Sequence, residues 1–305
     1  MKLAKRSDIV ILDSNVAVVE DGVLIWNADD AYFVLSIVQS STTNRKYKAT
    51  QDVPAGVDPI SDVNPVTGKG TYWFDIEATN YFKAFDELGS SVCSNIDSIY
   101  YKFQTSDVDI LYLKNIEALS VRVVVTDTAS GIVIQDETVD TTSRDVYDWF
   151  DWTYSKVEYD SSFYINLQMA YETTLEIYIE NTNSTASVGH IAFGTGVDVG
   201  LTLADPQPTV THRGVTSKTR DEFGNIVTRR KARYKRMTIN CIIDSLSVDI
   251  IENRLEKFVD IPLIVVGDER DGGYKSLVVY GELKDHDMPI GITKTKYTLE
   301  IEGYL

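Results

Sequence analysis

The sequence predicts a mainly β protein with a small N-terminal β-module, a central jelly-roll-type β-sandwich and a C-terminal β-sandwich or split-barrel-like domain that carries one helix. Short runs rich in Val, Ile, Thr and Tyr recur along the chain, and Gly, Asn, Asp or Ser bound them, as is typical of strands. The composition agrees, because 18 Tyr stand against 7 Pro, and aromatic and branched side chains fit a pleated surface. A length of 305 residues is enough for two or three domains with cores of their own.

Residues 1–62 are expected to form the small module. It ends at a linker that contains Pro54 and Pro59, through which neither a helix nor a sheet would continue. Turn-prone segments rich in Asp, Asn, Gly and Ser separate its short strands. The expected strands are 16–19, 23–26, 32–38 and 46–49.

The aromatic and turn residues of this module follow the order Trp26, Tyr32, Val38, Tyr47 and Pro54-Ala-Gly-x-x-Pro59. This order resembles the small chitin-binding-type modules of secreted glycosidases and phage tail proteins. The resemblance implies that Trp26 and Tyr47 are candidates for stacking on sugar rings. The alternative is that both side chains form the core of a very small module.

Residues 63–200 are expected to form the central sandwich. Along 119–126, Leu119, Val121, Val123 and Val125 alternate, as one face of a half-buried strand requires. Seven such segments without a helical period indicate an antiparallel sandwich of jelly-roll type. The expected strands are 71–77, 98–105, 109–116, 119–126, 131–137, 174–180 and 188–194.

Aromatic and acidic residues are interleaved in segment 147–154 of this domain. Trp149 and Trp152 are candidates for a carbohydrate site, because rings stack on sugar faces and carboxylates accept hydrogen bonds from hydroxyl groups. The alternative is a strand or loop whose Trp side chains cap the sandwich. Asp148 and Asp151 do not define a glycosidase pair, because the sequence does not place two carboxylates across a cleft.

Residues 201–305 are expected to form the last domain, with a helix at 245–258. Ser247 is its expected N-cap. One apolar face is expected to contain Ile250, Ile251, Leu255 and Phe258. The acidic segment 268–273 lacks the register of an EF-hand and is expected to be a hairpin turn. The expected strands are 209–213, 226–229, 234–243, 262–266, 276–282 and 294–302.

Charge is strongly sorted along the chain. The net charge is −17, yet segment 211–237 has nine Lys and Arg against two acids, a charge of +7, which leaves −24 for the rest. The turn signal at 223–225 and the strand formers at 237–243 predict a β-hairpin with a basic arm. We expect it to dock on an acidic surface of a neighbouring subunit; the alternative is a solvated strand face. The expected assembly interface is Arg229, Arg230, Lys231, Arg233, Lys235 and Arg236.

Several function classes are not expected. The acidic balance argues against specific nucleic-acid binding and against anionic membranes. The apolar run 9–12 is too short for a signal peptide, and no stretch is long enough for membrane insertion. Three His and two Cys form no cluster at metal spacing, and neither a nucleophile elbow nor a phosphate-binding loop is present. We therefore expect no enzyme activity, no cofactor and no metal.

Ordered short motifs over residues 70–303 are similar to those of a family of tailed-bacteriophage virion proteins. The motifs are Trp73-Phe-Asp-Ile-x-x-Thr79-Asn80, Asp221-x-Phe-Gly-Asn225, Arg229-x-x-x-Arg233-Tyr234-x-Arg236, Val279-Tyr-Gly281 and Tyr297-x-Leu-Glu-Ile-Glu-Gly303. The resemblance implies a structural tail component of the tip, hub or baseplate region. It would be made in the bacterial cytoplasm and built into the virion. Its partners would be copies of itself in a ring and other tail proteins. The alternative is an adsorption protein that binds host-surface polysaccharide.

Overall fold

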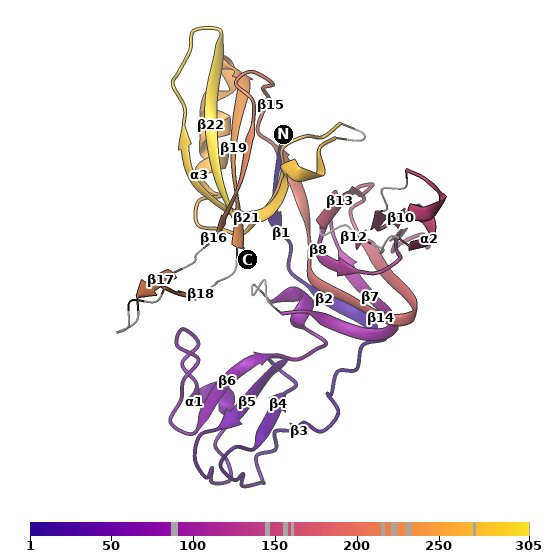
Figure 1. Cartoon of the computed structure of the whole chain (residues 1–305), viewed down its shortest axis with the longest axis vertical. Helices are drawn as coiled ribbons and strands as arrows, with labels where there is room; N and C mark the ends of the chain where they lie inside the picture. The colour runs from indigo at the N-terminus through magenta and orange to yellow at the C-terminus, as the bar shows by residue number, and fades with distance from the viewer. Residues whose placement is uncertain are drawn as a thin grey trace.

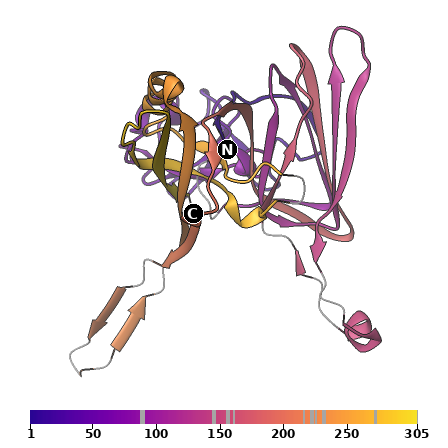
Figure 2. The ribbon, with the colours of Figure 1, turned by 90° about the horizontal axis from the view of Figure 1, so that it is seen from above.

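The computed structural model describes residues 1–86, 91–143, 147–154, 158–159, 162–214, 217–220, 224, 226–229, 233–270 and 273–304. The protein is mainly β, which confirms the predicted class. One 14-stranded sheet runs from the central sandwich into the C-terminal domain, and a separate four-stranded sheet forms the N-terminal module (Figure 1). Two short ribbons project away from this body (Figure 2).

The N-terminal module has the strand order β3-β4-β5-β6 and a short helix, α1. The strand at 73–78 was expected in the central domain, but it pairs with β5 and completes this module. The reason is its first residue, Trp73, which is fully buried in the module core and packs edge-on against Tyr32 at a centroid distance of 5.5 Å. The predicted boundary at residue 62 is therefore wrong. The elements are β3 (Leu24–Ile25), β4 (Ile37–Ser40), β5 (Arg45–Ala49), α1 (Pro59–Asp62) and β6 (Trp73–Ala78).

The central sandwich is organised around one strand of 26 residues, β14, where the sequence predicts two separate strands. Its first half pairs with β9 and β7, and its second half pairs with β8, while β7 continues to pair with it over residues 185–188. Between them the register shifts from Glu180 to Thr185, and Asn183 adopts a positive φ of 62°. The strand thus turns a corner and belongs to both layers. The elements are β2 (Val10–Ser14), η1 (Lys83–Phe85), β7 (Cys93–Thr105), β8 (Ile110–Glu117), β9 (Ser120–Asp127), β10 (Val133–Asp140), β13 (Ser162–Asn166) and β14 (Thr173–Asp198).

Valines of β9 confirm the predicted alternation. Val121, Val123 and Val125 are buried in the sandwich core, whereas Leu119 lies just before the strand and is exposed. Val124 is also buried, on the opposite face. β9 is therefore covered on both faces at this position.

The C-terminal domain has the strand order β20-β21-β22-β19, and β15 and β16 both pair along the outer edge of β19. Residues 268–270 and 273 lie in the connection between antiparallel strands β20 and β21, as the predicted hairpin requires. The elements are β15 (Leu201–Thr202), β16 (Thr209–Gly214), β19 (Arg233–Asp244), η2 (Ser245–Ser247), α3 (Val248–Glu256), β20 (Leu263–Val266), η3 (Lys275–Leu277), β21 (Val278–Asp287) and β22 (Lys294–Gly303).

The helix of this domain differs from the prediction in its start, in its end, which is Glu256 and not residue 258, and in one apolar residue. A 3-10 turn occupies the first three predicted positions, and α3 begins at Val248. Ser247 makes no side-chain cap hydrogen bond; instead Asp244 accepts one from the Leu246 amide at 3.3 Å. Ile251 and Leu255 face the core, but Ile250 points outward and is 57% exposed.

Strand β1 (Lys2–Arg6) joins the sandwich to the C-terminal domain. It pairs with β14 on one edge and with β20 on the other, although the sequence places it in the N-terminal module (Figure 1). Leu3 packs in the core of the C-terminal domain and Ala4 in a core between the two domains; both are fully buried. A glycine is needed opposite, since a Cβ at Gly194 would overlap the Lys5 carbonyl oxygen.

His190 lies on β14 beside this junction. Its side chain is buried, and its ring is 4.3 Å from the ring of Tyr280 on β21. Burial, and then the nearby charges of Arg6 and Lys114, lower the pKa of His190 to about 3. The folded protein therefore keeps this imidazole neutral under conditions where the unfolded chain would protonate it.

A His190→Gln variant is expected to lose part of the pH dependence of stability. The unfolded chain gains a proton on His190 below about pH 6.5, whereas the folded chain gains it near pH 3, so stability falls as the pH drops between these values. Between pH 7.5 and pH 5 we expect this contribution to be about 2 kcal/mol. Urea unfolding at both pH values measures it. His212→Gln, at an exposed position, is the control, and equal pH dependence in both variants would contradict the expectation.

Candidate functional site

The first projecting ribbon is the basic arm, residues 209–238. β16 pairs with the start of β19, and beyond them β17 (Ser217–Arg220) pairs with β18 (Ile226–Arg229). Gly224, at the far end, has a φ of +83°, which suits a tight turn. This pairing confirms the predicted hairpin, and Figure 2 shows it extending away from the C-terminal domain.

The predicted interface residues of the basic arm fall into two groups. Arg233 is exposed, as are Arg213 and Arg220 on the paired strands. Lys235 and Arg236 lie at the base and bind the protein's own body: the Lys235 amine donates to the Val278 carbonyl oxygen at 2.8 Å, and Arg236 pairs with Glu300. Burial also lowers the pKa of Lys235 to about 8. These two therefore have partners within the chain, and their place in an assembly interface stays a prediction. The side chain of Arg229, and Arg230 and Lys231 as a whole, lie outside the described residues.

The second projecting ribbon is the aromatic arm, residues 142–159. β11 (Thr142–Ser143) and β12 (Glu158–Tyr159) form its stem, and α2 (Trp149–Tyr154) lies at its end (Figure 2). The Asp148 carboxylate accepts a hydrogen bond from the Asp151 amide at 2.9 Å, which satisfies a donor in the first turn of α2. The segment is thus a helix held away from the body, and the interpretation as a cap of the sandwich is wrong.

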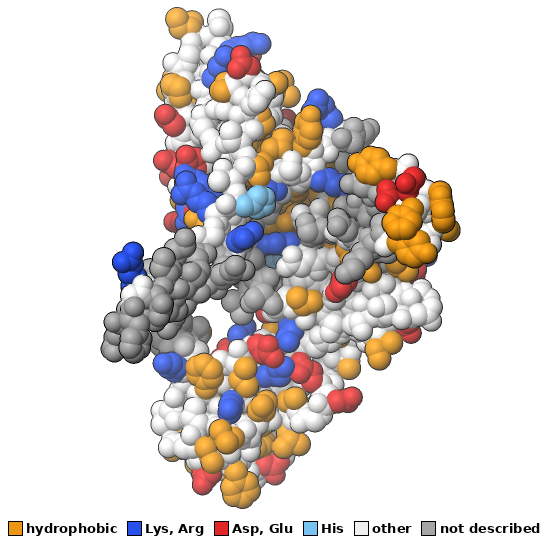
Figure 3. Space-filling view, in the orientation of Figure 1, with side chains coloured by type: hydrophobic (Ala, Val, Ile, Leu, Met, Phe, Trp, Pro, Cys, Tyr) orange, Lys and Arg blue, Asp and Glu red, His pale blue; other side chains and the backbone are white. Residues whose placement is uncertain are grey.

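The aromatic side chains of this arm are exposed. Trp149 is 76% and Trp152 is 66% exposed. Apolar side chains gather over α2 at the right of Figure 3. The rings of Phe150 and Tyr154 are 4.7 Å apart and shield each other in part. The exposed aromatic residues are Tyr147, Trp149, Phe150, Trp152 and Tyr154.

The two sugar-binding candidates of the N-terminal module contribute to its core. Tyr47 is buried, and its hydroxyl group is 3.1 Å from that of Thr43. Burial raises the pKa of this phenol. Trp26 is half-buried and packs against the same core. For Tyr47 the core interpretation therefore holds, and its ring has no face open to a sugar.

Exposed apolar side chains of this module lie in a loop where the sequence predicts a strand, 32–38. Phe33 is 79% and Leu35 is 64% exposed, and Leu35 has a positive φ of 71°. Hydrogen bonds from the Val34 amide to Asp52 and from the Leu35 amide to the Ala49 carbonyl oxygen hold the loop in place. The sequence signal for this apolar surface is the run Phe33–Leu35 that follows buried Tyr32. The run alone does not show that these side chains face solvent, because Asp52 and Ala49 hold the loop in this orientation.

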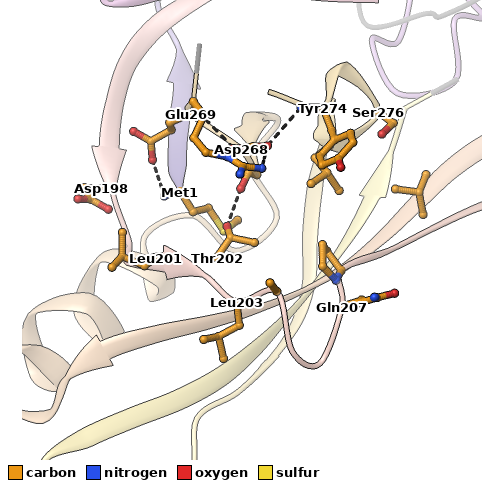
Figure 4. Close-up of a pocket in the computed structure, with 16 residues that line it drawn as sticks. Met1, Asp198, Leu201, Thr202, Leu203, Gln207, Asp268, Glu269, Tyr274 and Ser276 are labelled. Carbon is orange, nitrogen blue, oxygen red and sulfur yellow. Dashed lines mark hydrogen bonds and ion pairs between the residues drawn. The ribbon is translucent and has the colours of Figure 1, made fainter. Parts of the chain in front are cut away.

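A pocket of about 910 Å³ lies between the β15–β16 connection and the β20–β21 connection (Figure 4). Leu201, Leu203 and Leu277 contribute apolar surface. At the rim the Arg270 guanidinium holds the Asp268 carboxylate through hydrogen bonds of 2.8 and 2.7 Å, and it keeps the pKa of that carboxyl group well below its usual range. The lining also includes Glu269, which forms an ion pair with the N-terminal amine of Met1, so apolar and charged groups both face the pocket.

Two further kinds of feature, a metal site and a membrane-spanning helix, are absent from the residues that the structure describes. No three His, Cys, Asp or Glu side chains there come together as a metal site. No helix among these residues is long and apolar enough to cross a membrane. Cys93 and Cys241 are buried in two separate cores, and burial raises the pKa of each thiol to about 11.

The fold and these surfaces define a mainly β protein with an acidic body, a basic arm and an aromatic arm. The sequence matches no family model, and comparisons with curated proteins and with solved structures give no match either. The functional argument therefore rests on the chain's own motifs and surfaces.

Proposed function

We propose that this chain is a structural component of a bacteriophage tail, in the tip, hub or baseplate region, and that it assembles through protein–protein contacts. The resemblance of its motifs over 70–303 to tailed-phage virion proteins supports the class. The basic arm supports assembly: a hairpin that leaves the body and exposes Arg213, Arg220 and Arg233 is suited to reach another molecule.

Charge supports the idea that the other molecule is a second copy or another acidic tail protein. The segment 211–237 has a charge of +7 and the rest of the chain −24, so one copy carries both complementary surfaces. Complementary charges select partner and register even where their net energy is small. Contacts between different faces of identical copies close into a ring when the rotation divides the circle.

Reversing three charges of the basic arm is expected to abolish assembly while the monomer stays folded. Arg229→Glu, Arg230→Glu and Lys231→Glu each remove two units of charge, so +7 becomes +1. Light scattering of the purified chain at low salt measures molar mass, and circular dichroism reports folding. The wild-type chain should form oligomers, and the variant should be a monomer of 34.2 kDa.

The matched control makes the same three reversals on the body, at exposed Lys257, Lys294 and Lys296. This control should assemble like the wild-type chain if the position of the charge matters and not the total. A wild-type chain that stays monomeric, or a basic-arm variant that assembles normally, would contradict the proposal.

Host-surface carbohydrate binding is the second candidate function. The observation in its favour is the aromatic arm, where exposed Trp149 and Trp152 accompany the carboxylates of Asp148 and Asp151. A glycan array with the purified chain distinguishes the two, because a purely structural role predicts no saturable binding.

A further inference from the structure

The aromatic arm exposes more apolar surface than its own structure can use. Five aromatic side chains of the arm are each more than half exposed, four of them on the six-residue helix α2 and the fifth, Tyr147, just before it. The stem that carries them has two residues in each strand. Short helices and two-stranded ribbons are marginal alone in water, and a cluster of exposed aromatic rings marks a contact surface. The arm therefore has the features of a segment that a partner covers.

The chemistry of the arm favours a cationic partner. Residues 142–159 contain four acidic and two basic residues, a net charge of −2, and no Lys or Arg lies between 147 and 154. Arginine guanidinium groups stack on aromatic faces and bind carboxylates through paired hydrogen bonds. Asp148 and Trp149 are adjacent and both exposed, so one arginine could contact a carboxylate and a ring together.

The basic arm of this same chain is a segment of that kind. It presents Arg213, Arg220 and Arg233 to solvent along an extended ribbon. Figures 1 and 2 place the two arms on opposite flanks of the body, and Figure 2 shows both projecting toward the same side. Because they are far apart within one molecule, contact between them requires two copies.

We propose that the aromatic arm of one copy receives the basic arm of the next copy. This inference rests on the proposed assembly function and names the surface that the basic arm binds. Each copy then donates on one flank and accepts on the other, a head-to-tail contact that forms a ring or an open chain. The aromatic rings and the two aspartates make the acceptor, and the exposed arginines make the donor.

Two complementary defective chains test this arrangement. The acceptor-defective chain carries Trp149→Ala and Trp152→Ala, and the donor-defective chain carries Arg213→Glu, Arg220→Glu and Arg233→Glu at the exposed arginines of the basic arm. Each alone should be a monomer by light scattering. An equimolar mixture retains one intact donor and one intact acceptor, so it should form a dimer of twice 34.2 kDa and nothing larger.

Fluorescence gives a second readout that does not depend on mass. The chain has four Trp, and the acceptor-defective chain lacks the two exposed ones. In the mixture, Trp149 and Trp152 belong to the donor-defective chain alone. Covering them should shift the emission to shorter wavelength relative to the sum of the separate chains. A mixture without this shift and without the dimer would overturn the inference.

The outcomes separate this inference from the proposed function. If the donor-defective chain is monomeric but the acceptor-defective chain assembles like the wild type, the basic arm binds elsewhere, and the inference fails while the proposed function stands. If the donor-defective chain itself assembles, the proposed function fails. Phe33→Ala with Tyr171→Ala is the control, because both rings are exposed outside the arm, at 79% and 75%, and this variant should assemble normally.

Discussion

An Ala4→Asp substitution is expected to break the connection between the sandwich and the C-terminal domain. Ala4 is fully buried, and β1 pairs with β14 and β20 on its two edges. A carboxylate at this position would be surrounded by apolar side chains with no partner, which costs about 3–5 kcal/mol or more. In differential scanning calorimetry we expect the variant to unfold at lower temperature and in separate steps for the two domains.

The neighbouring residue of the same strand supplies the control. Lys5 is exposed, so Lys5→Asp introduces the same side chain where water solvates it. A surface substitution of this kind usually changes stability by less than about 0.5 kcal/mol. If both variants lost equal stability, the effect would come from the charge of the strand and not from the buried junction.

The role of β1 also shows which part of the fold the sequence alone does not reveal. Strand propensity and turn signals are local, and they predict the mainly β class and the hairpin of the basic arm. The partners of β1 lie at 194–198 and 263–266, far along the chain. Nothing within the first six residues identifies these partners, so the sequence predicts no strand at 2–6 and places these residues in the nearest module.

The corner in β14 is a second case in which local composition and long-range pairing differ. Residues 181–185, Asn-Thr-Asn-Ser-Thr, have the composition of a loop. They remain part of one strand because β7 runs alongside and pairs both before and after the register shift. The polar residues and the positive φ of Asn183 accommodate the bend, at a place where the sequence predicts a break between two strands.

The candidate sites also combine features that the sequence predicts with features that depend on distant parts of the chain. The charge run predicts that a basic arm exists, because charge can be counted from the sequence. It does not separate Lys235 and Arg236 from the other cations, because their partners, Val278 and Glu300, come from other strands of the sheet. The side chains of segment 147–154 suggested an aromatic surface, but their exposure depends on a stem that holds the segment away from the sandwich.

Trp73→Ala is expected to unfold the N-terminal module and leave the sandwich folded. Trp73 is fully buried, packs edge-on against Tyr32, and donates from Nε1 to the Val57 carbonyl oxygen at 3.0 Å. Replacing a buried Trp by Ala costs about 3–5 kcal/mol, a large share of what so small a core can supply. Hydrogen exchange should show lost protection in β5 and β6, with β9 and β14 unchanged, because the module has its own sheet and core.

A milder substitution separates packing from hydrogen bonding at this site. Trp73→Phe keeps an aromatic ring but leaves the Val57 carbonyl oxygen without its donor, so it should cost less than Trp73→Ala and still exceed about 1 kcal/mol. For Trp73→Ala, a loss of protection in β9 equal to the loss in β5 would mean that the module and the sandwich unfold together. Unchanged protection in β5 would mean that Tyr32 and Tyr47 maintain the core without this indole. Either result would contradict the expectation that the N-terminal module, including β6, is an independent folding unit centred on Trp73.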